Sequence, residues 1–438
     1  MTAAREAGAL RVGMVPVTER GSGGIYQYSH TMLEALAADA QAQVTLLVPR
    51  PLDAPLPGAV PSWPVVPYLP PPAPPGAAQR LKAGLRRAMP HWLMARRDAR
   101  RQARAQAFAT AHLDAPPVRA AIGDAMRSAG VDFVIYPSPN PIAFEAGLPY
   151  IMAIHDLQHR LQPEFPEVSA GGEWEMREYI IRNGARRATL LLADSQVGKE
   201  DILAFYGAYG VTEDRVKVLP FLPASYLDAA VPAAMRASVR ATYALPPRYL
   251  FYPAQFWPHK NHRRIVEALM VLQRTHGVDV PVVFAGSQGD AIREAAFAEV
   301  RETAHRGGVS RLLHTIGYVP DAAMSALYAE AAGLVMPTFF GPTNIPILEA
   351  WGAGCPVITS DLRGIREQAG DAAVLVDPRS VESIAAGILR VWTDAPFARE
   401  LAARGHRRLR EYTAADYRRV FGAILQEAKA RVQSSPRA

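Results

Sequence analysis

The chain repeats one pattern along its length: a short apolar segment, a turn, and then a helical segment. The first block of this pattern has strand-like segments at residues 10–17, 44–48, 131–136, 150–154, 189–193 and 216–219. The second block has them at residues 249–252, 280–285, 311–316, 334–336 and 356–360. Strands that alternate with helices indicate parallel sheets with crossover helices. The sequence therefore predicts an α/β fold with two domains of this kind.

The chain length supports this division, because 438 residues are too many for one compact core. We expect an N-terminal Rossmann-like domain in residues 1–228, a C-terminal Rossmann-like domain in residues 229–400, and a helical tail in residues 401–438. In open α/β sheets, ligands bind beyond the carboxyl ends of the strands. Two such sheets that face each other would place a site in the cleft between the domains.

Two unusual segments interrupt the first block within residues 51–112. Residues 51–75 include 11 prolines, which cannot continue a helix or a sheet, so we expect extended polyproline structure or loop. Residues 80–104 carry nine Lys or Arg and one acid, Asp98, which gives a local charge of +8 in a chain of net charge +7. Apolar residues lie between these cations. The segment predicts an amphipathic helix, either at an anionic membrane surface or solvated and packed on the first domain.

Composition excludes several classes of protein. With 49% hydrophobic and 20% charged residues, the chain is typical of soluble globular proteins. No nucleic-acid-binding motif occurs, so nucleic acid is not an expected partner. A single cysteine excludes an internal disulfide framework and fits a reducing compartment. No apolar run is long enough to span a bilayer and no signal pattern precedes the first strand. We therefore expect a cytoplasmic protein, which residues 80–104 could hold at the inner membrane face.

The segment after the apolar run 333–336 indicates the chemistry. A turn rich in Pro, Gly, Thr and Asn leads into a helix that would begin near Ile345, with Asn344 as its N-cap. Free N–H groups at such a helix end suit a phosphate. Glu349, one turn further on, is better placed to accept hydrogen bonds from sugar hydroxyls than to approach phosphates. The segment therefore predicts a site for a sugar that is linked to a nucleotide through phosphates.

A second segment places Lys260 at the start of a helix, after the strand-like residues 249–252. A lysine there opposes the helix dipole unless an anion is bound. Lys260 is therefore a candidate ligand of the same phosphates, and a solvated surface lysine is the alternative.

Glycines follow the first strand in the run Gly21-Ser22-Gly23-Gly24, where backbone N–H groups could approach a phosphate or a sugar. An ordinary tight turn is the alternative. Tyr26 stands where a dinucleotide-binding loop has its last glycine, and no acid is well placed after the second strand to bind a ribose. A nicotinamide-dependent oxidoreductase is therefore not expected.

His155 and Asp156 directly follow the strand-like residues 150–154. The imidazole could donate a hydrogen bond to a sugar hydroxyl or to a leaving phosphate, and Asp156 could orient the ring. A pair that only caps its own loop is the alternative. His159 is too close in the chain for the three residues to form a metal site, so no metal is expected.

Other polar residues at strand ends have structural explanations. Asp194 or Ser195 can cap the helix that runs to Phe205. Cys355 lies just before a strand and is expected to be a buried thiol, not a nucleophile. Glu367 can be explained by a salt bridge.

Together, these segments resemble the retaining glycosyltransferases of family four, which have the GT-B fold. That family shows a Glu-Gly-Phe-Gly-Leu-Pro-x-x-Leu-Glu-Ala run, in which Glu349 matches the second Glu and Gly341 stands at the first. The family also shows a Gly-Arg-x-x-x-x-Lys-Asn run, in which Lys260 matches the Lys and Gln255 stands at the Arg. This chain therefore lacks the carboxylate that contacts the transferred sugar in the family, and one of the two cations that grip the donor diphosphate.

The resemblance implies two facing Rossmann-like domains, with a C-terminal helix that crosses back onto the first. It implies transfer of a hexose, with retention, from a nucleotide diphosphate sugar to a glycan or lipid-linked acceptor in polysaccharide or lipopolysaccharide assembly. No metal and no cofactor are expected, and the leaving phosphate helps to deprotonate the acceptor. The implied catalytic residues are His155 and Asp156. The implied donor-binding residues are Gly23, Gly24, Gln255, Lys260, Thr343, Asn344, Ile345 and Glu349.

Two other functions fit the same fold. A nucleotide-sugar epimerase would use the donor site without any acceptor. A non-catalytic nucleotide-sugar-binding protein would explain why Gly341 and Gln255 depart from the family pattern.

Overall fold

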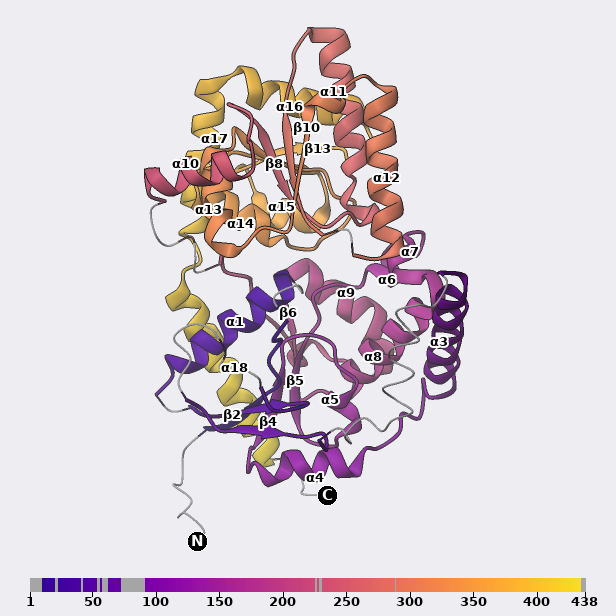
Figure 1. Ribbon diagram of the computed structural model, residues 1–438. Coiled ribbons are helices and arrows are strands. Elements are labelled where there is room, and N and C mark those ends of the chain that lie inside the picture. Colours follow the sequence, from indigo (N-terminus) through magenta and orange to yellow (C-terminus); the bar gives the residue numbers. More distant parts are fainter. Residues whose placement is uncertain are drawn as a thin grey trace.

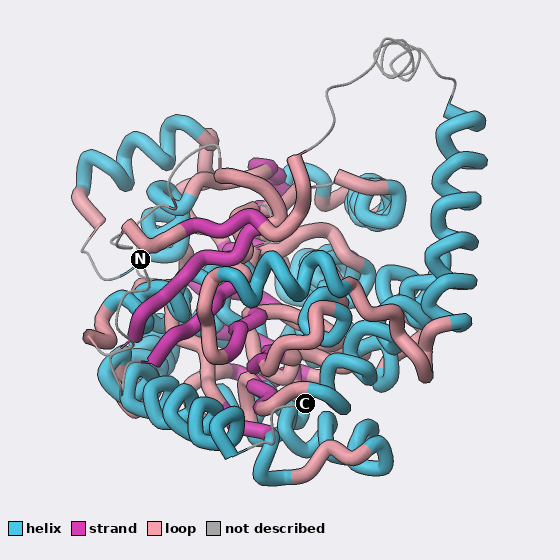
Figure 2. The backbone as a smooth tube through the Cα atoms, turned by 90° about the horizontal axis from the view of Figure 1, so that it is seen from below, coloured by secondary structure: helices cyan, strands magenta, loops and turns pink. Residues whose placement is uncertain are grey.

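The computed structural model describes the chain except for residues 1–9, 20–22, 41, 53–55, 57–61, 72–90, 225–226, 228–230, 288 and 435–438. It has two domains, each with a parallel sheet covered by helices, and one domain lies above the other in Figure 1. Seen from below, helices surround the strands (Figure 2). The predicted α/β fold with two domains is confirmed.

The N-terminal sheet has seven parallel strands in the order β3-β2-β1-β4-β5-β6-β7. Its strands are β1 (Leu10–Met14), β2 (Ala42–Val48), β3 (Val65–Pro67), β4 (Phe133–Tyr136), β5 (Tyr150–Ala153), β6 (Leu190–Ala193) and β7 (Val216–Val218). Every residue of β4, β5 and β6 is buried, because helices cover both faces of the sheet. Strands in that position are continuous apolar runs, and this is the signal that the sequence carries.

The helices of this domain are α1 (Gly24–Ala37), α3 (His91–Ala111), α4 (Ala120–Ser128), α5 (Ile142–Glu145), α6 (Gln158–Leu161), α7 (Pro166–Ser169), α8 (Glu173–Arg187) and α9 (Gln196–Tyr206). Three short 3₁₀ helices accompany them: η2 (Ala170–Gly172), η3 (Gly207–Tyr209) and η4 (Glu213–Arg215). The Ser195 hydroxyl accepts from the Gly198 N–H and caps α9, as predicted.

The C-terminal sheet has six parallel strands in the order β10-β9-β8-β11-β12-β13. Its strands are β8 (Leu250–Pro253), β9 (Val282–Ala285), β10 (Leu313–Gly317), β11 (Gly333–Met336), β12 (Val357–Ser360) and β13 (Val374–Val376). The helices are α10 (Ala233–Thr242), α11 (His262–His276), α12 (Ala291–Arg306), α13 (Asp321–Glu330), α14 (Ile345–Gly352), α15 (Arg363–Ala369), α16 (Val381–Thr393) and α17 (Ala395–Leu409), with the 3₁₀ helices η6 (Pro258–Lys260) and η7 (Ser310–Leu312). Cys355 is buried, and burial raises the pKa of its thiol to about 12.

The last helix, α18 (Ala414–Ser434), crosses back onto the N-terminal domain beside α1 (Figure 1). Its buried residues Tyr417, Phe421 and Leu425 join the core under the N-terminal sheet. The crossing comes later than the boundary predicted at residue 401. Leu401 belongs to the C-terminal core, so α17 stays with that domain to its end.

The proline-rich segment departs from its prediction. β3 pairs in parallel with β2 at the edge of the N-terminal sheet. An edge strand uses one side of its backbone for the ladder, so proline is tolerated there. The prediction that residues 51–75 cannot continue a sheet is therefore wrong for Val65–Pro67.

The basic segment is helical from His91 to Ala111, and residues 80–90 lie outside the described residues. The second half of α3 packs on α8, with Ala109 fully buried, whereas Arg96, Arg97 and Arg100 are exposed. Among the helices that the structure describes, none combines the length and the apolar character needed to cross a bilayer.

Candidate active site

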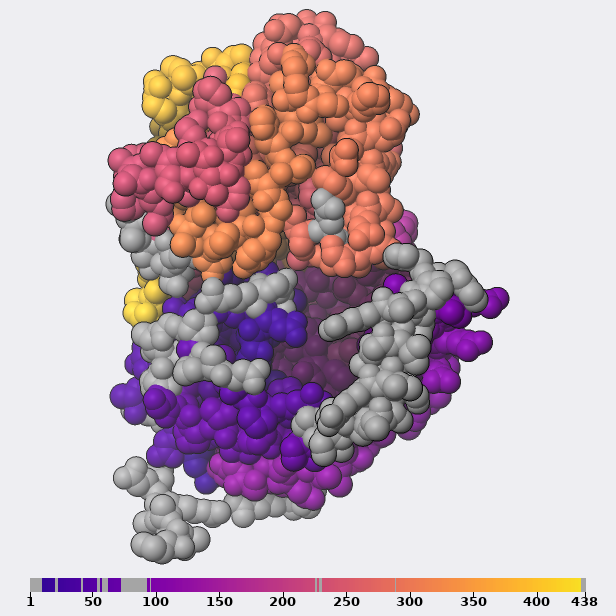
Figure 3. Space-filling view, in the orientation of Figure 1, coloured from indigo at the N-terminus to yellow at the C-terminus, as the bar shows by residue number. Residues whose placement is uncertain are grey.

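A cavity of about 1450 Å³ lies between the two domains. Figure 3 shows the hollow from one side, with residues of both domains around it. The loops after β1, β5 and β6 line it from one domain, and the loops after β8 and β11 line it from the other. The site thus lies beyond the carboxyl ends of the strands. Nine of the ten predicted site residues line the cavity: Gly23, Gly24, His155, Asp156, Gln255, Lys260, Thr343, Asn344 and Ile345.

The tenth predicted residue, Glu349, lies behind the cavity wall. Its side chain is buried in α14, and one carboxylate oxygen accepts a hydrogen bond of 2.8 Å from the Tyr328 hydroxyl on α13. Glu349 is not among the residues that line the cavity. The structure therefore gives the predicted ribose contact no support, because the side chain turns toward α13.

Glu349→Gln tests which role this carboxylate has. The amide would leave a buried N–H₂ group beside the Tyr328 hydroxyl, so we expect the free energy of unfolding to fall by about 1–3 kcal/mol. Donor affinity should change less than about twofold. Thermal unfolding and donor titration on the same preparation measure the two effects. A large loss of donor affinity with unchanged stability would restore the ribose contact.

Both ring nitrogens of His155 are held by the N-terminal domain itself. Nδ1 lies 3.0 Å from the Asp194 carboxylate, and Nε2 lies 2.7 Å from the carbonyl oxygen of Pro137. Both partners are acceptors, so both nitrogens carry a proton and the ring is an imidazolium. Burial by itself lowers the pKa of His155, but Asp194 and the Pro137 carbonyl outweigh it and raise the pKa above its ordinary value. The rings of Tyr28 and Phe221 pack against the imidazolium.

This geometry corrects two predictions. Asp194, not Asp156, orients the His155 ring, and Asp194 does not cap α9. Neither nitrogen of His155 is available to a sugar hydroxyl while its two protein contacts last. The His155 imidazolium and the Asp194 carboxylate form an ion pair in the cavity wall, which both residues line.

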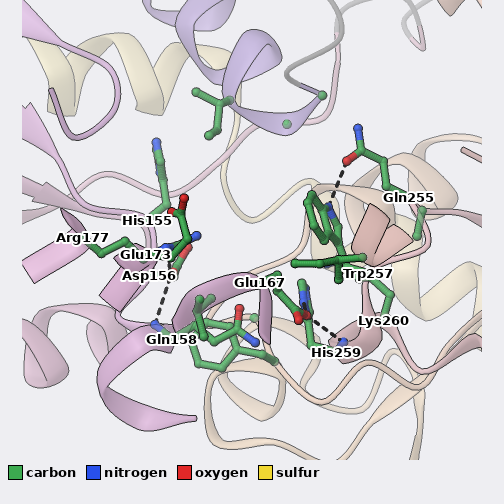
Figure 4. Close-up of a pocket in the computed structure, with 18 of the residues that line it drawn as sticks. His155, Asp156, Gln158, Glu167, Glu173, Arg177, Gln255, Trp257, His259 and Lys260 are labelled. Atoms are coloured by element: carbon green, nitrogen blue, oxygen red, sulfur yellow. Dashed lines mark hydrogen bonds and ion pairs between the residues drawn. The ribbon is translucent and has the colours of Figure 1, made fainter. Parts of the chain in front are cut away.

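Asp156 has partners of its own. Its carboxylate accepts from the Gln158 N–H at 3.0 Å and lies 3.4 Å from the Arg177 guanidinium. Burial by itself raises the pKa of Asp156, but Arg177 and the Gln158 N–H outweigh it, so the pKa is below its ordinary value. Figure 4 shows Asp156 and His155 on one side of the cavity, across from Lys260.

His159 does not join His155 and Asp156. Its Nε2 lies 3.3 Å from Glu178 in the interior of the domain. Over the described part of the chain, no three His, Cys, Asp or Glu side chains are grouped so that they could hold a metal ion.

Lys260 ends the 3₁₀ helix η6 and is half-buried in the cavity wall. Burial lowers the pKa of its ammonium to about 8, against the opposing effect of the Asp156 and Glu167 carboxylates. Among the described residues, no carboxylate lies within ion-pair distance of this ammonium. Lys260 is thus a cation that an anionic ligand could pair with, as predicted for a donor diphosphate.

The loop before α14 supplies the other half of the predicted donor site. Asn344 stands at the N-cap, but its side chain does not cap the helix. Gln368 of α15 holds the Asn344 backbone instead, accepting from its N–H and donating to its carbonyl oxygen, both at 2.9 Å. Ile345 meets the N-terminal domain: a Cβ added to Gly24 would lie 3.2 Å from its Cδ1. The two predicted loops are therefore brought together.

Gln255 stands where the family has Arg, and among the described residues that line the cavity the cation nearest to it in the chain is Lys260. Its side-chain oxygen accepts from the Trp257 indole N–H at 2.9 Å. The Arg293 guanidinium lies over the Trp257 ring, 4.7 Å from its centroid, and pairs with Asp290 at 2.7 Å. Arg293 is not among the lining residues.

Three residues at the domain boundary were missed or misjudged from the sequence. Glu167 contacts His259 across the cleft, and Gln368 holds the Asn344 backbone. Glu367 does not form the predicted salt bridge among the described residues: its carboxylate accepts from two backbone N–H groups at the start of α9, at 2.8 and 2.9 Å. No local pattern could have found these contacts, because their partners lie far apart in the chain.

Comparisons with known proteins agree with this architecture. Residues 247–394 match the family model described as Glycosyl transferases group 1. O-antigen chain mannosyltransferase B of Escherichia coli is 32% identical over 165 residues, which are 38% of this chain and 42% of that protein. The chain thus matches about two fifths of the length of this curated relative.

Solved structures match over nearly the whole chain. Sucrose-phosphate synthase of Thermosynechococcus elongatus has a TM-score of 0.66 at 16% identity, and the match covers 96% of this chain and 99% of that one. Anabaena HepE in complex with UDP and glucose has a TM-score of 0.63 at 16% identity, with coverage of 95% and 99%. Similarity at this level of identity establishes the fold. The chain has the predicted GT-B fold, and its residues 247–394 match the glycosyl transferases group 1 family model, which confirms the resemblance to the family-four glycosyltransferases.

Proposed function

We propose that the protein is a retaining, metal-independent glycosyltransferase that moves a hexose from a nucleotide diphosphate sugar to a glycan or lipid-linked acceptor. The observation that carries the proposal is the cavity between the domains, where Lys260 and the start of α14 lie opposite the Gly23–Gly24 turn. The group 1 domain covers the C-terminal side of this cavity. No cofactor is needed, because the donor carries its own leaving group.

In this proposal, the C-terminal domain holds the donor diphosphate. The Lys260 ammonium pairs with it, and the start of α14, where Asn344 and Ile345 line the cavity, adds the positive end of the helix dipole, so that charge on the leaving diphosphate is stabilised. The His155–Asp194 ion pair lies in the opposite wall. The leaving phosphate accepts the proton of the acceptor hydroxyl on the same face of the sugar. We assign no protein nucleophile.

The acceptor would enter from the N-terminal side of the cavity. That wall includes Arg101 of α3 and Glu173 and Arg177 of α8. The O-antigen mannosyltransferase among the relatives suggests a polysaccharide or lipopolysaccharide acceptor, and it makes a mannosyl donor the first to test.

A panel of UDP- and GDP-linked hexoses, with and without a glycan acceptor, tests the proposal. Transfer to the acceptor supports it, and conversion of the donor sugar without an acceptor would indicate an epimerase. Donor binding without any turnover would indicate a binding protein. A thermal-shift screen finds the donor first, because a ligand at 100 times its dissociation constant stabilises the protein by about 2.7 kcal/mol.

The exposed basic face of α3 also suggests where the enzyme acts. We propose that it is cytoplasmic and that this face holds it at the inner membrane. Changing Arg96, Arg97, Arg100 and Arg104 to Gln should abolish binding to vesicles with acidic lipid, because each such cation contributes about 1 kcal/mol. Wild-type binding should fade as salt rises. Co-sedimentation with vesicles measures both effects.

Activity on a soluble acceptor analogue should survive these four changes, since none of the residues lines the cavity. Arg101 is kept because it does line it. Wild-type binding that ignores lipid charge and salt, or no binding at all, would leave α3 as a solvated helix.

A further inference from the structure

Glu167 reaches from the N-terminal domain to the donor side of the cleft. It lies on α7, and its side chain is only 5% exposed. Its Oε1 accepts from the backbone N–H of His259 at 3.0 Å and from Nδ1 of the same residue at 2.7 Å (Figure 4). Burial by itself raises the pKa of Glu167, but the hydrogen bonds from His259 outweigh it and lower the pKa. An ionised carboxylate therefore crosses from one domain to the other.

His259 ties this carboxylate to the two predicted donor segments. It directly precedes Lys260 in η6. Its carbonyl oxygen accepts from the Phe339 N–H at 2.8 Å and from the Thr338 hydroxyl at 3.1 Å. The loop that leads to Gly341 and the η6 segment are thus one hydrogen-bonded unit, and Glu167 is one of its contacts with the other domain.

The second oxygen of Glu167 receives no hydrogen bond from the part of the chain that the structure describes. Oε2 is buried without a hydrogen-bond partner, and so are Thr343 Oγ1 and Asn344 Nδ2. All three residues line the cavity. A buried polar atom without a partner is costly, most of all on a carboxylate. The Glu167 oxygen is an acceptor, the Thr343 hydroxyl is both donor and acceptor, and the Asn344 N–H₂ group is a donor. A ligand rich in hydroxyls could form hydrogen bonds with all three.

Gly341, which stands where the family has a Glu, supplies no carboxylate to the cavity. Its φ is 144°, which favours glycine, and a Cβ there would lie 2.4 Å from the Asn344 amide. No carboxylate can therefore extend from this position without moving Asn344. A carboxylate that contacts a sugar in this cavity would therefore have to come from another element.

We propose that Glu167 supplies this carboxylate from the opposite domain: Oε2 accepts a hydrogen bond from a hydroxyl of the transferred sugar, while Oε1 holds His259. This inference rests on the proposed function, in which a nucleotide sugar occupies the cavity. Its consequence is that the sugar is recognised only when the domains are together, because the carboxylate and the diphosphate ligand Lys260 come from different domains.

Glu167→Gln separates the two halves of this role. The Gln side-chain oxygen can still accept from His259, whereas its N–H₂ group replaces the acceptor Oε2. We expect affinity for the nucleoside diphosphate to change less than about twofold. Affinity for the sugar nucleotide should fall by about 10- to 100-fold, the usual loss for a hydrogen bond to a charged group. Titration calorimetry with both ligands measures the difference.

Gln162→Ala is the matched control. Gln162 makes another contact between the domains, a hydrogen bond of 2.8 Å from its side chain to the Phe339 carbonyl oxygen, but it does not line the cavity. This variant should weaken the two ligands equally. If Glu167→Gln also weakens them equally, or weakens neither, Glu167 does not touch the sugar and the inference fails.

Deoxy donors test the inference on the wild-type protein, independently of how any variant folds. One deoxy sugar nucleotide should lose about 10- to 100-fold in affinity for the wild type, and Glu167→Gln should bind it as weakly as the full donor. No loss for any deoxy position would overturn the inference. These are binding measurements, so they test the inference even if no transfer is detected. If the protein transfers the sugar but binds every deoxy donor as well as the full donor, the proposed function holds and the inference about Glu167 fails.

Discussion

Lys260→Ala should weaken binding of the nucleoside diphosphate and of its sugar by a factor of about 30 to several thousand. Removing one partner of a desolvated charge pair costs about 2–5 kcal/mol, and Gln255, which stands where the family has a second cation, is neutral. Affinity for the nucleoside without phosphates should change little. Titration of the three ligands into wild type and variant measures the pattern.

The depressed pKa of Lys260 adds a pH signature. Burial lowers the pKa to about 8, so the free ammonium loses its proton as pH rises through that value. Binding of an anion then requires uptake of a proton, and wild-type affinity for the diphosphate should fall above pH 8 by up to about tenfold per unit. The alanine variant should lose this dependence.

Arg263→Ala is a control for general effects of charge. Arg263 lies three residues further along, on the outer face of α11, where it pairs with Glu267 and Glu299. Its removal should leave donor affinity and the pH profile unchanged. Equal losses in the two variants, or diphosphate affinity that Lys260→Ala does not alter, would remove Lys260 from the donor site.

The sequence predicts the fold well because its signals are local. Central strands such as β4 and β6 are apolar on every residue, so a continuous apolar run identifies them. The sequence analysis missed the edge strands β3, which lies among prolines, and β13, although it found the equally short edge strand β7. An edge strand tolerates prolines that a central strand could not accommodate.

The same distinction applies to the site. Residues that face the cavity from strand ends, such as Lys260 and Gly24, follow from local pattern and from the rule that ligands bind at carboxyl ends. The residues that orient these side chains through hydrogen bonds cannot be predicted from local pattern or from that rule. Asp194 meets His155 because β6 and β5 are neighbours in the sheet, and Glu167 meets His259 because the domains face each other. Such contacts depend on register and domain placement, which no short motif encodes.

Asp194→Ala should cause the largest loss of stability, about 3–5 kcal/mol in the free energy of unfolding. It would leave the buried imidazolium of His155 without its counter-charge, and breaking a buried pair from one side is strongly destabilising. Asp194→Asn should cost less. Its amide can donate to Nδ1 of a neutral ring while Nε2–H still donates to the Pro137 carbonyl oxygen.

The pH dependence of stability identifies the mechanism. The pKa of His155 is raised in the folded protein, so the pair contributes its full stability below the unfolded pKa of about 6.5 and loses it as pH rises through the folded pKa. The buried residues His259 and His262 have pKa values lowered to about 4 and about 3, so they affect stability only below pH 6.5. Urea unfolding from pH 6 to 8, below the titration of the Lys260 ammonium, should therefore show a decline in wild type that Asp194→Asn lacks. If both Asp194 variants lose equal stability and keep the wild-type slope, the imidazolium assignment is wrong and His155 is neutral.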